Sequence, residues 1–352
     1  MLPLLTINLD KLQHNTEEIV DLCRTASVEV CGVTKGVLGS TEVARAMLAG
    51  GVKSIGDSRL TSLRRPKKDK ISSNLFMLRQ PMKAEIKEAV SVAGTILLSD
   101  FKAAEALAYE ARKKSKTIGV VLMVETGDLR EGIIPNELRE FTRKILALRG
   151  VKLKGLATNA TCLRKNVPTL KSLLLLCSQA YDLEKFFGIK LAFVSGGNSS
   201  ALQLVEKRKL PDRINQLRIG EAILLGHKTP YSAPIKGTYQ NCFVLSAEVL
   251  QVRKRPSSLE KGFKKKKAHF QRQAVVALGK QDVAEAKLKP LFEGVEVARS
   301  SDHLVLDLSE KGKVFKSGEV VNFIPSYFAL LQAMTSPFVK KKFIGASDKG
   351  VK

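Results

Sequence analysis

Two hydrophobic patterns alternate along the first two-thirds of the chain. Short runs rich in Val, Ile and Leu are followed by longer segments in which apolar residues recur three and four positions apart. The first pattern predicts β-strands and the second predicts amphipathic α-helices. The predicted strands are Val28–Thr34, Lys53–Gly56, Leu75–Leu78, Thr95–Leu98, Ile118–Val124, Lys152–Ala157, Leu191–Val194 and Gln216–Ile219. The predicted helices include Ser40–Ala49, Lys83–Val92, Lys102–Lys113, Glu137–Leu148 and Thr169–Phe187.

Eight strand–helix units in about 230 residues are typical of a (β/α)8 TIM barrel. A doubly wound open sheet also alternates strands and helices, but eight consecutive units without a long antiparallel excursion favour a closed barrel. We therefore expect an α/β fold in which residues 1–230 form the barrel.

The pattern changes after residue 230, where strand-like runs follow one another without long helices between them. These runs are Cys242–Val252, Gln273–Leu278, Glu293–Ala298, His303–Leu308 and Glu319–Ile324. They predict a mostly-β domain over residues 231–352, joined to the barrel through a connector at Tyr231–Pro234. We expect the basic run Lys261–Lys267 to be a mobile loop, and the tail from Lys340 onward to be solvated and partly disordered.

The charge of the chain raises the question of nucleic acid. Its 352 residues include 59 Lys and Arg against 34 Asp and Glu, which gives a formal charge of +25. Such an excess attracts polyphosphates. However, Trp is absent, Tyr numbers five, and no basic stretch is interleaved with aromatic residues in the manner of a base-stacking surface. The composition therefore disfavours nucleic-acid binding.

Composition also bears on the compartment. The five Cys are scattered without C-x-x-C spacing, no apolar run reaches the roughly 20 residues that cross a bilayer, and the N-terminus lacks a basic signal-peptide region. These features favour a reduced, cytoplasmic protein outside the membrane. None of the four His shows metal-ligand spacing, so we expect no metal.

The active site of a TIM barrel lies at the carboxyl ends of its strands, so the residues that follow each predicted strand are the informative ones. Lys35 follows the first strand, where partial desolvation would favour the neutral amine that Schiff-base chemistry needs; the alternative is a side chain that simply reaches solvent. Arg130 lies in the glycine-rich segment Glu125–Gly132 and could bind a carboxylate or pair with Asp128 or Glu131.

Two further segments predict a phosphate site. Ser195–Ser200 follows the seventh strand and Leu217–Glu221 covers the eighth strand and the turn after it, and both contain small residues that expose backbone N–H groups. Each alone also fits a tight turn with a capping Ser. Together they favour phosphate, because loops at these two places commonly bind it in barrels.

These segments together resemble the alanine racemase superfamily, the fold-type III pyridoxal-phosphate enzymes with a TIM barrel and a C-terminal β domain. The chain is most similar to the predicted amino-acid racemases that include ornithine racemase. The motifs that carry the resemblance are Gly127–Gly132 (GDLREG), Ser195–Ser200 (SGGNSS), Leu217–Ala222 (LRIGEA), and Ser336–Phe338 after Ser326–Tyr327. The resemblance extends over about residues 4–338.

The resemblance implies a set of residues for the cofactor pyridoxal 5′-phosphate: Lys35, Asn159, Ser199, Arg218, Gly220, Glu221 and Tyr327. Lys35 would be the Schiff-base residue and one catalytic base, and Arg218 would face the pyridine nitrogen and keep it unprotonated. Asn159 stands where alanine racemases place a ring-stacking His, and the other four residues would hold the phosphate. Arg130 would contact the substrate carboxylate, and Asp302 lies near the substrate contacts that a partner subunit supplies.

The sequence differs from the alanine racemase pattern at three places. Met123 stands where alanine racemases often carry a carbamylated Lys, which argues against a plain alanine racemase. Phe263 stands where the second base, usually a Tyr from the other subunit, is expected, and a phenyl ring cannot transfer a proton. Lys264–Lys267 replaces a stretch that is usually acidic, and His269 could supply a base or be only a solvated loop residue.

We therefore expect a pyridoxal-phosphate-dependent amino-acid racemase, a homodimer whose active site is shared between subunits. A non-catalytic pyridoxal-phosphate-binding protein and a fold-type III decarboxylase are the alternatives. Lysine or ornithine as substrate would need a carboxylate for the distal ammonium, and the sequence alone identifies no single candidate.

Overall fold

The computed structural model describes residues 2–160, 167–256, 270–308 and 313–345. The chain divides into two compact units, of which one comprises residues 10–239 and the other comprises residues 1–9 together with 240–352. The division therefore falls at Tyr239–Gln240, and the first nine residues belong with the C-terminal part of the chain.

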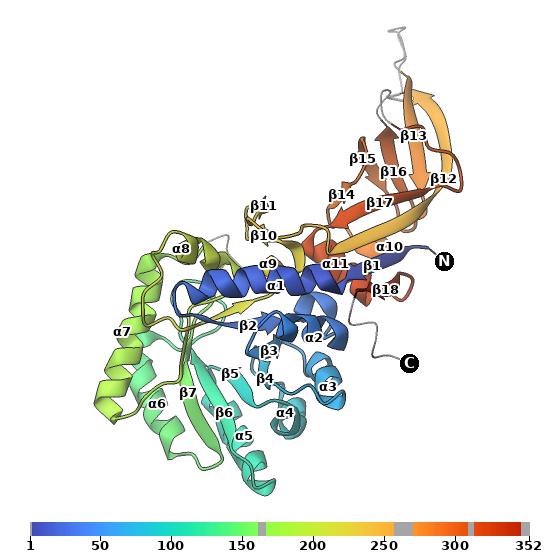
Figure 1. Ribbon diagram of the computed structural model, residues 1–352. Coiled ribbons are helices and arrows are strands. Elements are labelled where there is room, and N and C mark those ends of the chain that lie inside the picture. Colours follow the sequence, from blue (N-terminus) through green and yellow to red (C-terminus); the bar gives the residue numbers. More distant parts are fainter. Residues whose placement is uncertain (1, 161–166, 257–269, 309–312, 346–352) are drawn as a thin grey trace, which may run out of the picture. The chain divides into compact units, whose positions relative to one another are not determined.

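The first unit is a closed barrel of eight parallel strands that follow one another in chain order (Figure 1). Pairing of the last strand with the first closes it, with Cys31 opposite Arg218. The strands are β2 (Glu29–Val33), β3 (Ser54–Asp57), β4 (Asn74–Met77), β5 (Thr95–Leu98), β6 (Ile118–Met123), β7 (Val151–Ala157), β8 (Phe193–Ser195) and β9 (Gln216–Ile219). The predicted barrel is confirmed, and each predicted strand matches an observed one to within two residues at either end.

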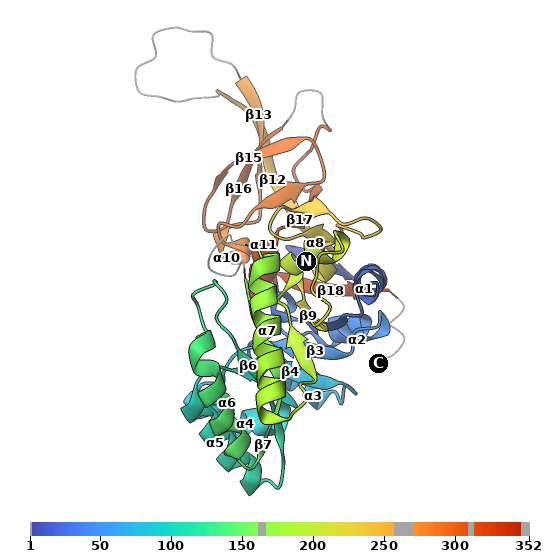
Figure 2. The same ribbon diagram turned by 90° about the vertical axis from the view of Figure 1, so that its left-hand side faces the viewer.

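Helices cover the outside of the barrel, and Figure 2 shows α5, α6 and α7 against its outer face. The helices are α1 (Leu9–Arg24), α2 (Thr41–Ala49), α3 (Leu60–Lys68), α4 (Ile86–Val92), α5 (Phe101–Lys113), α6 (Leu138–Ala147), α7 (Leu170–Phe187), α8 (Leu202–Glu206) and α9 (Glu221–Leu225), with 3-10 turns η1 (Lys35–Val37), η2 (Lys83–Glu85), η3 (Pro135–Glu137) and η4 (Ser199–Ala201). In α6 the buried residues are Leu138, Thr142 and Ile145, spaced three and four apart. That spacing places them on one helical face, which packs inward.

An apolar layer fills part of the barrel interior. It consists of Cys31, Phe76, Leu97, Val121, Met123 and Ala157. Met123 is only 2% exposed within this layer. Met123 is therefore part of the hydrophobic core, and a charge at this position would be buried among apolar side chains.

The second unit is an eight-stranded sheet in the order β14-β17-β12-β13-β16-β15, with β1 paired to both β12 and β18. Its strands are β1 (Leu4–Asn8), β12 (Phe243–Pro256), β13 (Phe270–Val276), β14 (Leu288–Pro290), β15 (Gly294–Arg299), β16 (Leu304–Leu308), β17 (Val320–Pro325) and β18 (Lys340–Ile344), accompanied by α10 (Lys280–Val283) and α11 (Tyr327–Thr335). Its pairs are antiparallel apart from β1 with β18. The predicted C-terminal β fold is thus confirmed.

Two expectations about this part of the chain change. A partly disordered tail from Lys340 onward is wrong for Lys340–Ile344, because these residues form β18 and pair in parallel with Leu4–Asn8, while Lys340 and Lys342 are exposed as expected. The backbone bonds to β1 give this basic run a place in the sheet that its composition did not indicate. The connector at residues 231–234 contains β11 (Ala233–Pro234), which pairs with β10 (His227–Lys228). The basic run Lys261–Lys267 lies outside the described residues.

Within the described ranges, none of the helices has the length and apolar character needed to cross a membrane.

Candidate active site

Lys35 lies directly after β2, at the carboxyl end of the barrel. It is the first residue of η1, and it is half-buried. The chain then turns tightly through Gly39, whose φ is +66° and whose added Cβ would lie 2.3 Å from the Ser62 carbonyl oxygen. Only glycine fits this turn. Ser40 then caps α2 by accepting a hydrogen bond from Val43 N at 3.3 Å. The glycine turn and the helix cap therefore fix the backbone that follows Lys35, and with it the position of the lysine at the end of the barrel.

A buried carboxylate lies close to this lysine. Asp57 ends β3, is 1% exposed, accepts a hydrogen bond from Thr34 Oγ1 at 3.0 Å and accepts another from Arg59 N at 3.0 Å. Burial raises the pKa of Asp57, while these two hydrogen bonds and the positive charge of Lys35 act in the opposite direction. Sequence reasoning missed Asp57; its signal was an acidic residue at the end of a buried strand.

The two loops predicted to bind phosphate lie side by side. Ser199 Oγ accepts a hydrogen bond from Ala222 N at 3.2 Å, and Arg218 N donates to the Gly197 carbonyl oxygen at 2.9 Å. Gly197 has a φ of +120°, and a Cβ on Gly220 would lie 2.9 Å from the Val33 carbonyl oxygen. Both glycines are therefore required by the backbone. The loops after β8 and β9 form one small-residue surface at the same end of the barrel as Lys35.

Arg218 is held inside the barrel mouth and is 5% exposed. Its Nη1 donates to Ser195 Oγ at 2.5 Å, and its Nη2 donates to the Thr158 carbonyl oxygen at 2.6 Å. These acceptors come from the ends of two neighbouring strands, β8 and β7. The guanidinium is therefore positioned by the barrel itself, and it brings a fixed positive charge to the site.

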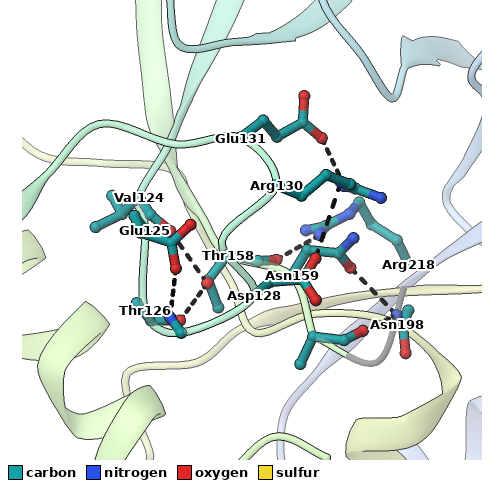
Figure 3. A network of polar contacts seen from close by, with 12 residues as sticks. Val124, Glu125, Thr126, Asp128, Arg130, Glu131, Thr158, Asn159, Asn198 and Arg218 are labelled. Carbon is teal, nitrogen blue, oxygen red and sulfur yellow. Dashed lines mark hydrogen bonds and ion pairs between the residues drawn. The ribbon is translucent and has the colours of Figure 1, made fainter. Parts of the chain in front are cut away.

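Figure 3 shows the loop after β6 folded over this region, with Arg130 at its centre. The loop is closed at its base by a bridge between Val124 and Ile133. Arg130 pairs with both carboxylates that the sequence offered: its Nη2 is 2.5 Å from Glu131 Oε1, and its Nε is 3.8 Å from Asp128 Oδ2. Its side chain is 31% exposed, so the guanidinium is still open to a ligand.

Asn159 joins this loop to the loop after β8. Its amide oxygen accepts from Asn198 Nδ2 at 3.2 Å in one orientation; in the other it accepts from Arg130 Nη2 at 2.7 Å and from Nη1 at 3.3 Å. The shorter, charge-assisted contact favours the orientation toward Arg130. Asn159, Arg130 and Arg218 are thus brought together, as Figure 3 shows.

Glu221 begins α9, next to the small-residue surface. Burial raises the pKa of its carboxyl group, and the charge of the nearby His227 acts against this rise. The Glu221 Oε1 atom is 4.0 Å from His227 Nδ1. The Glu221 side chain therefore lies near His227, whereas the phosphate is expected to contact the backbone of Glu221.

The remaining predicted residues belong to the other unit or lie outside the described residues. Tyr327 begins α11, which Ser326 caps. Asp302 lies in an exposed turn, where a hydrogen bond from His303 lowers its pKa. Their roles stay predictions. Phe263 and His269 lie outside the described residues.

The chain combines a closed parallel barrel with a second, mostly antiparallel β unit. Lys and Arg side chains gather at the carboxyl end of the barrel, where TIM-barrel enzymes have their active sites. Fold and site together therefore define a two-unit enzyme of the TIM-barrel class. The family model for the alanine racemase N-terminal domain matches residues 7–228. This chain belongs to the alanine racemase family.

Named relatives cover nearly the whole chain. The lysine racemase of Thermotoga maritima is 36% identical, covering 97% of this chain and 98% of the relative. The ornithine racemase of Acetoanaerobium sticklandii is 31% identical, covering 98% of this chain and 100% of the relative. Among solved structures, alanine racemase from Streptomyces coelicolor superposes with a TM-score of 0.78 at 17% identity, covering 97% of this chain and 98% of that chain. The last comparison concerns the fold alone.

Proposed function

We propose that this protein is a pyridoxal-phosphate-dependent racemase that interconverts the L and D forms of a basic amino acid, lysine or ornithine. The observation that carries the proposal is the convergence of Lys35, Arg130, Arg218 and the two small-residue loops at one end of the barrel. The lysine and ornithine racemases among the relatives support the choice of substrate.

The residues present fit pyridoxal phosphate, on which enzymes of this family depend. The paired loops offer the Ser199 hydroxyl and backbone N–H groups for a phosphate, with Gly197 and Gly220 keeping the surface free of side chains. The Arg218 guanidinium cannot give up its proton, so it suits an unprotonated ring nitrogen. When bound, the cofactor withdraws electrons from the substrate Cα and acidifies its proton.

Each side chain then has one task. Lys35 is the covalent attachment point and moves a proton at one face of the substrate Cα. Arg130 binds the substrate carboxylate through its guanidinium, and Asn159 accepts from that guanidinium and orients it. Arg218 holds the cofactor ring in place.

The second face of the Cα requires a second base, which we assign to a partner subunit in a homodimer. Ser199, Gly220 and Glu221 hold the phosphate in this proposal with Tyr327, and Asp302 contributes to substrate binding across the dimer. The free thiols of Cys23, Cys31 and Cys177 support a reducing compartment, and we place the protein in the cytoplasm.

Chiral chromatography of L-lysine, L-ornithine and L-alanine incubated with the cofactor-loaded protein tests the proposal. We expect D-lysine or D-ornithine to form, and the Lys35→Ala variant to form neither. Borohydride reduction followed by peptide mapping should place the cofactor on Lys35 in the wild type. An unlabelled Lys35 in cofactor-loaded protein would remove the basis for the assignment.

A further inference from the structure

Asp128 is a buried carboxylate in the loop after β6, and its surroundings are unusual. Its side chain is 6% exposed, and neither carboxylate oxygen receives a hydrogen bond from the described residues. The loop's other two carboxylates are already engaged: Glu125 Oε1 accepts from Gly127 N at 2.5 Å, and Glu131 Oε1 accepts from Arg130 at 2.5 Å.

The cation beside Asp128 is Arg130, whose Nε is 3.8 Å from Asp128 Oδ2. This distance allows attraction between charges but is too long for a hydrogen bond. Carboxylates are rarely buried without donors, because the lost hydration is not replaced. Asp128 therefore has unused acceptor capacity at the mouth of the barrel, directly beside the guanidinium that we assign to the substrate carboxylate (Figure 3).

We propose that Asp128 is the residue that binds the side-chain ammonium of the substrate and thereby selects basic amino acids. The inference rests on the proposed function and names the specificity residue of that site. An ammonium brings three donors to a carboxylate that lacks them. When Arg130 turns to the substrate α-carboxylate, the substrate ammonium takes its place as the cation beside Asp128.

This exchange keeps the buried charges balanced. The guanidinium and the Asp128 carboxylate lie within the length of one substrate, because the carboxyl carbon and the terminal nitrogen of extended ornithine are roughly 6 Å apart. Alanine carries no second cation. It would draw Arg130 away and leave Asp128 buried without a charge partner, which is strongly unfavourable. Discrimination against alanine follows from the same geometry.

Asp128→Asn in the cofactor-loaded protein tests this inference, because asparagine keeps the size and removes the charge. The readout is equilibrium binding, followed by the change in cofactor absorbance, for L-lysine and for L-norleucine, an apolar analogue without the ammonium. We expect the variant to weaken lysine binding by about 30-fold or more, as for other buried charge pairs. Norleucine binding should become tighter, because the variant no longer leaves a buried carboxylate without a charge partner when Arg130 turns to the ligand carboxylate.

An equal loss for both ligands would overturn the inference, because it would mean that Asp128 serves only to orient Arg130. Unchanged lysine binding would overturn it too. Glu131→Gln is the matched control, since it removes the other carboxylate that pairs with Arg130. It should affect lysine and norleucine alike; a loss confined to lysine would assign the ammonium to Glu131 and contradict the proposal.

The same experiment separates this inference from the proposed function. If wild-type protein shows no cofactor absorbance and no label on Lys35, the proposed function itself fails. If the cofactor binds at Lys35 and the wild type racemises lysine, but Asp128→Asn binds lysine as well as the wild type does, only the role of Asp128 is wrong.

Discussion

Asp57 is a carboxylate buried beside the candidate catalytic lysine, and its raised pKa makes a prediction about stability. A carboxyl group whose pKa is higher in the folded protein than its ordinary value of 3.8 holds its proton more tightly when folded. As pH rises above 3.8, the unfolded chain ionises first, so this group lowers the free energy of unfolding until the pH passes its folded pKa. Asp57 therefore destabilises the fold at neutral pH relative to acid pH.

The Asp57→Asn variant removes this titration. We expect the free energy of unfolding of the variant, minus that of the wild type, to become more positive as pH rises above 3.8 and then to level off. Urea unfolding at a series of pH values measures the difference. A constant or falling difference would show that the Asp57 pKa is not raised. Asp302→Asn is the control, because the pKa of Asp302 is lowered. For this variant, the difference in the free energy of unfolding should become more negative as pH rises, and it should do so below pH 3.8.

At the level of single residues, the sequence predicted where residues lie in the barrel better than it predicted which side chains surround them. Lys35, Arg218 and the glycines of the two loops could be found because each follows or ends a strand that is recognisable by its apolar run. The sequence did not indicate that the carboxylates of Asp57 and Asp128 are buried, because burial of a carboxylate depends on what folds over it. Asp128 stood out only once its burial and the engagement of Glu131 were known.

At the level of elements, close strand packing in the barrel wall sets a strict requirement at Gly155 of β7. A Cβ added there would lie 1.9 Å from the Phe193 carbonyl oxygen of β8. The Gly155→Ala substitution must push the two strands apart, because neither backbone can yield locally. We expect it to lower the free energy of unfolding by about 3 kcal/mol or more, measured by urea unfolding.

Gly188→Ala is the matched comparison, since Gly188 has a φ of +62° at the end of α7 but no atom within 4 Å of an added Cβ. Only backbone strain acts there, at a cost of about 1 kcal/mol. Equal losses for the two variants would mean that strand spacing at Gly155 is not the limiting factor.

Elements were predictable where the pattern repeats and local signals agree. The eight barrel strands carry continuous apolar runs between amphipathic helices, and the closed sheet follows from their number. β1 and β18 were missed because neither has such a signal: β1 runs directly into α1, and β18 is mostly Lys. Their pairing joins the two ends of the chain, which no local pattern can indicate.

At the level of the whole molecule, this pairing predicts that the N-terminus stabilises the C-terminal unit. β1 lies between β12 and β18 and buries Leu5 and Ile7 completely. Removing residues 1–8 leaves β18 without the strand it pairs with and takes one partner from β12, which still pairs with β13 and β17. We expect faster amide hydrogen exchange across β18 and at Val244 and Ser246 of β12, whose N–H groups face β1, with protection in barrel strands such as β5 and β6 retained. The prediction would be contradicted if the barrel strands lost protection as well, or if the truncation changed protection in neither unit.

The family and the class of amino-acid racemase, both predicted from a few loop motifs, are confirmed by the comparisons. The motifs sufficed because barrel enzymes place their chemistry at the ends of strands, where sequence position and spatial position correspond. The excess of 59 basic over 34 acidic residues did not help, since the proposed site involves only three of the cations: Lys35, Arg130 and Arg218.

The central claim is that this chain exchanges the α-proton of a basic amino acid. Incubation of the cofactor-loaded protein with L-lysine and L-ornithine in deuterated water, followed by NMR of the Cα position, tests it most directly. We predict that deuterium replaces the α-proton as the D form accumulates, and that Lys35→Ala abolishes both. An intact α-proton in protein with cofactor attached at Lys35 would indicate a non-catalytic carrier. Release of carbon dioxide with a diamine product would indicate a decarboxylase. Either result would contradict the racemase assignment.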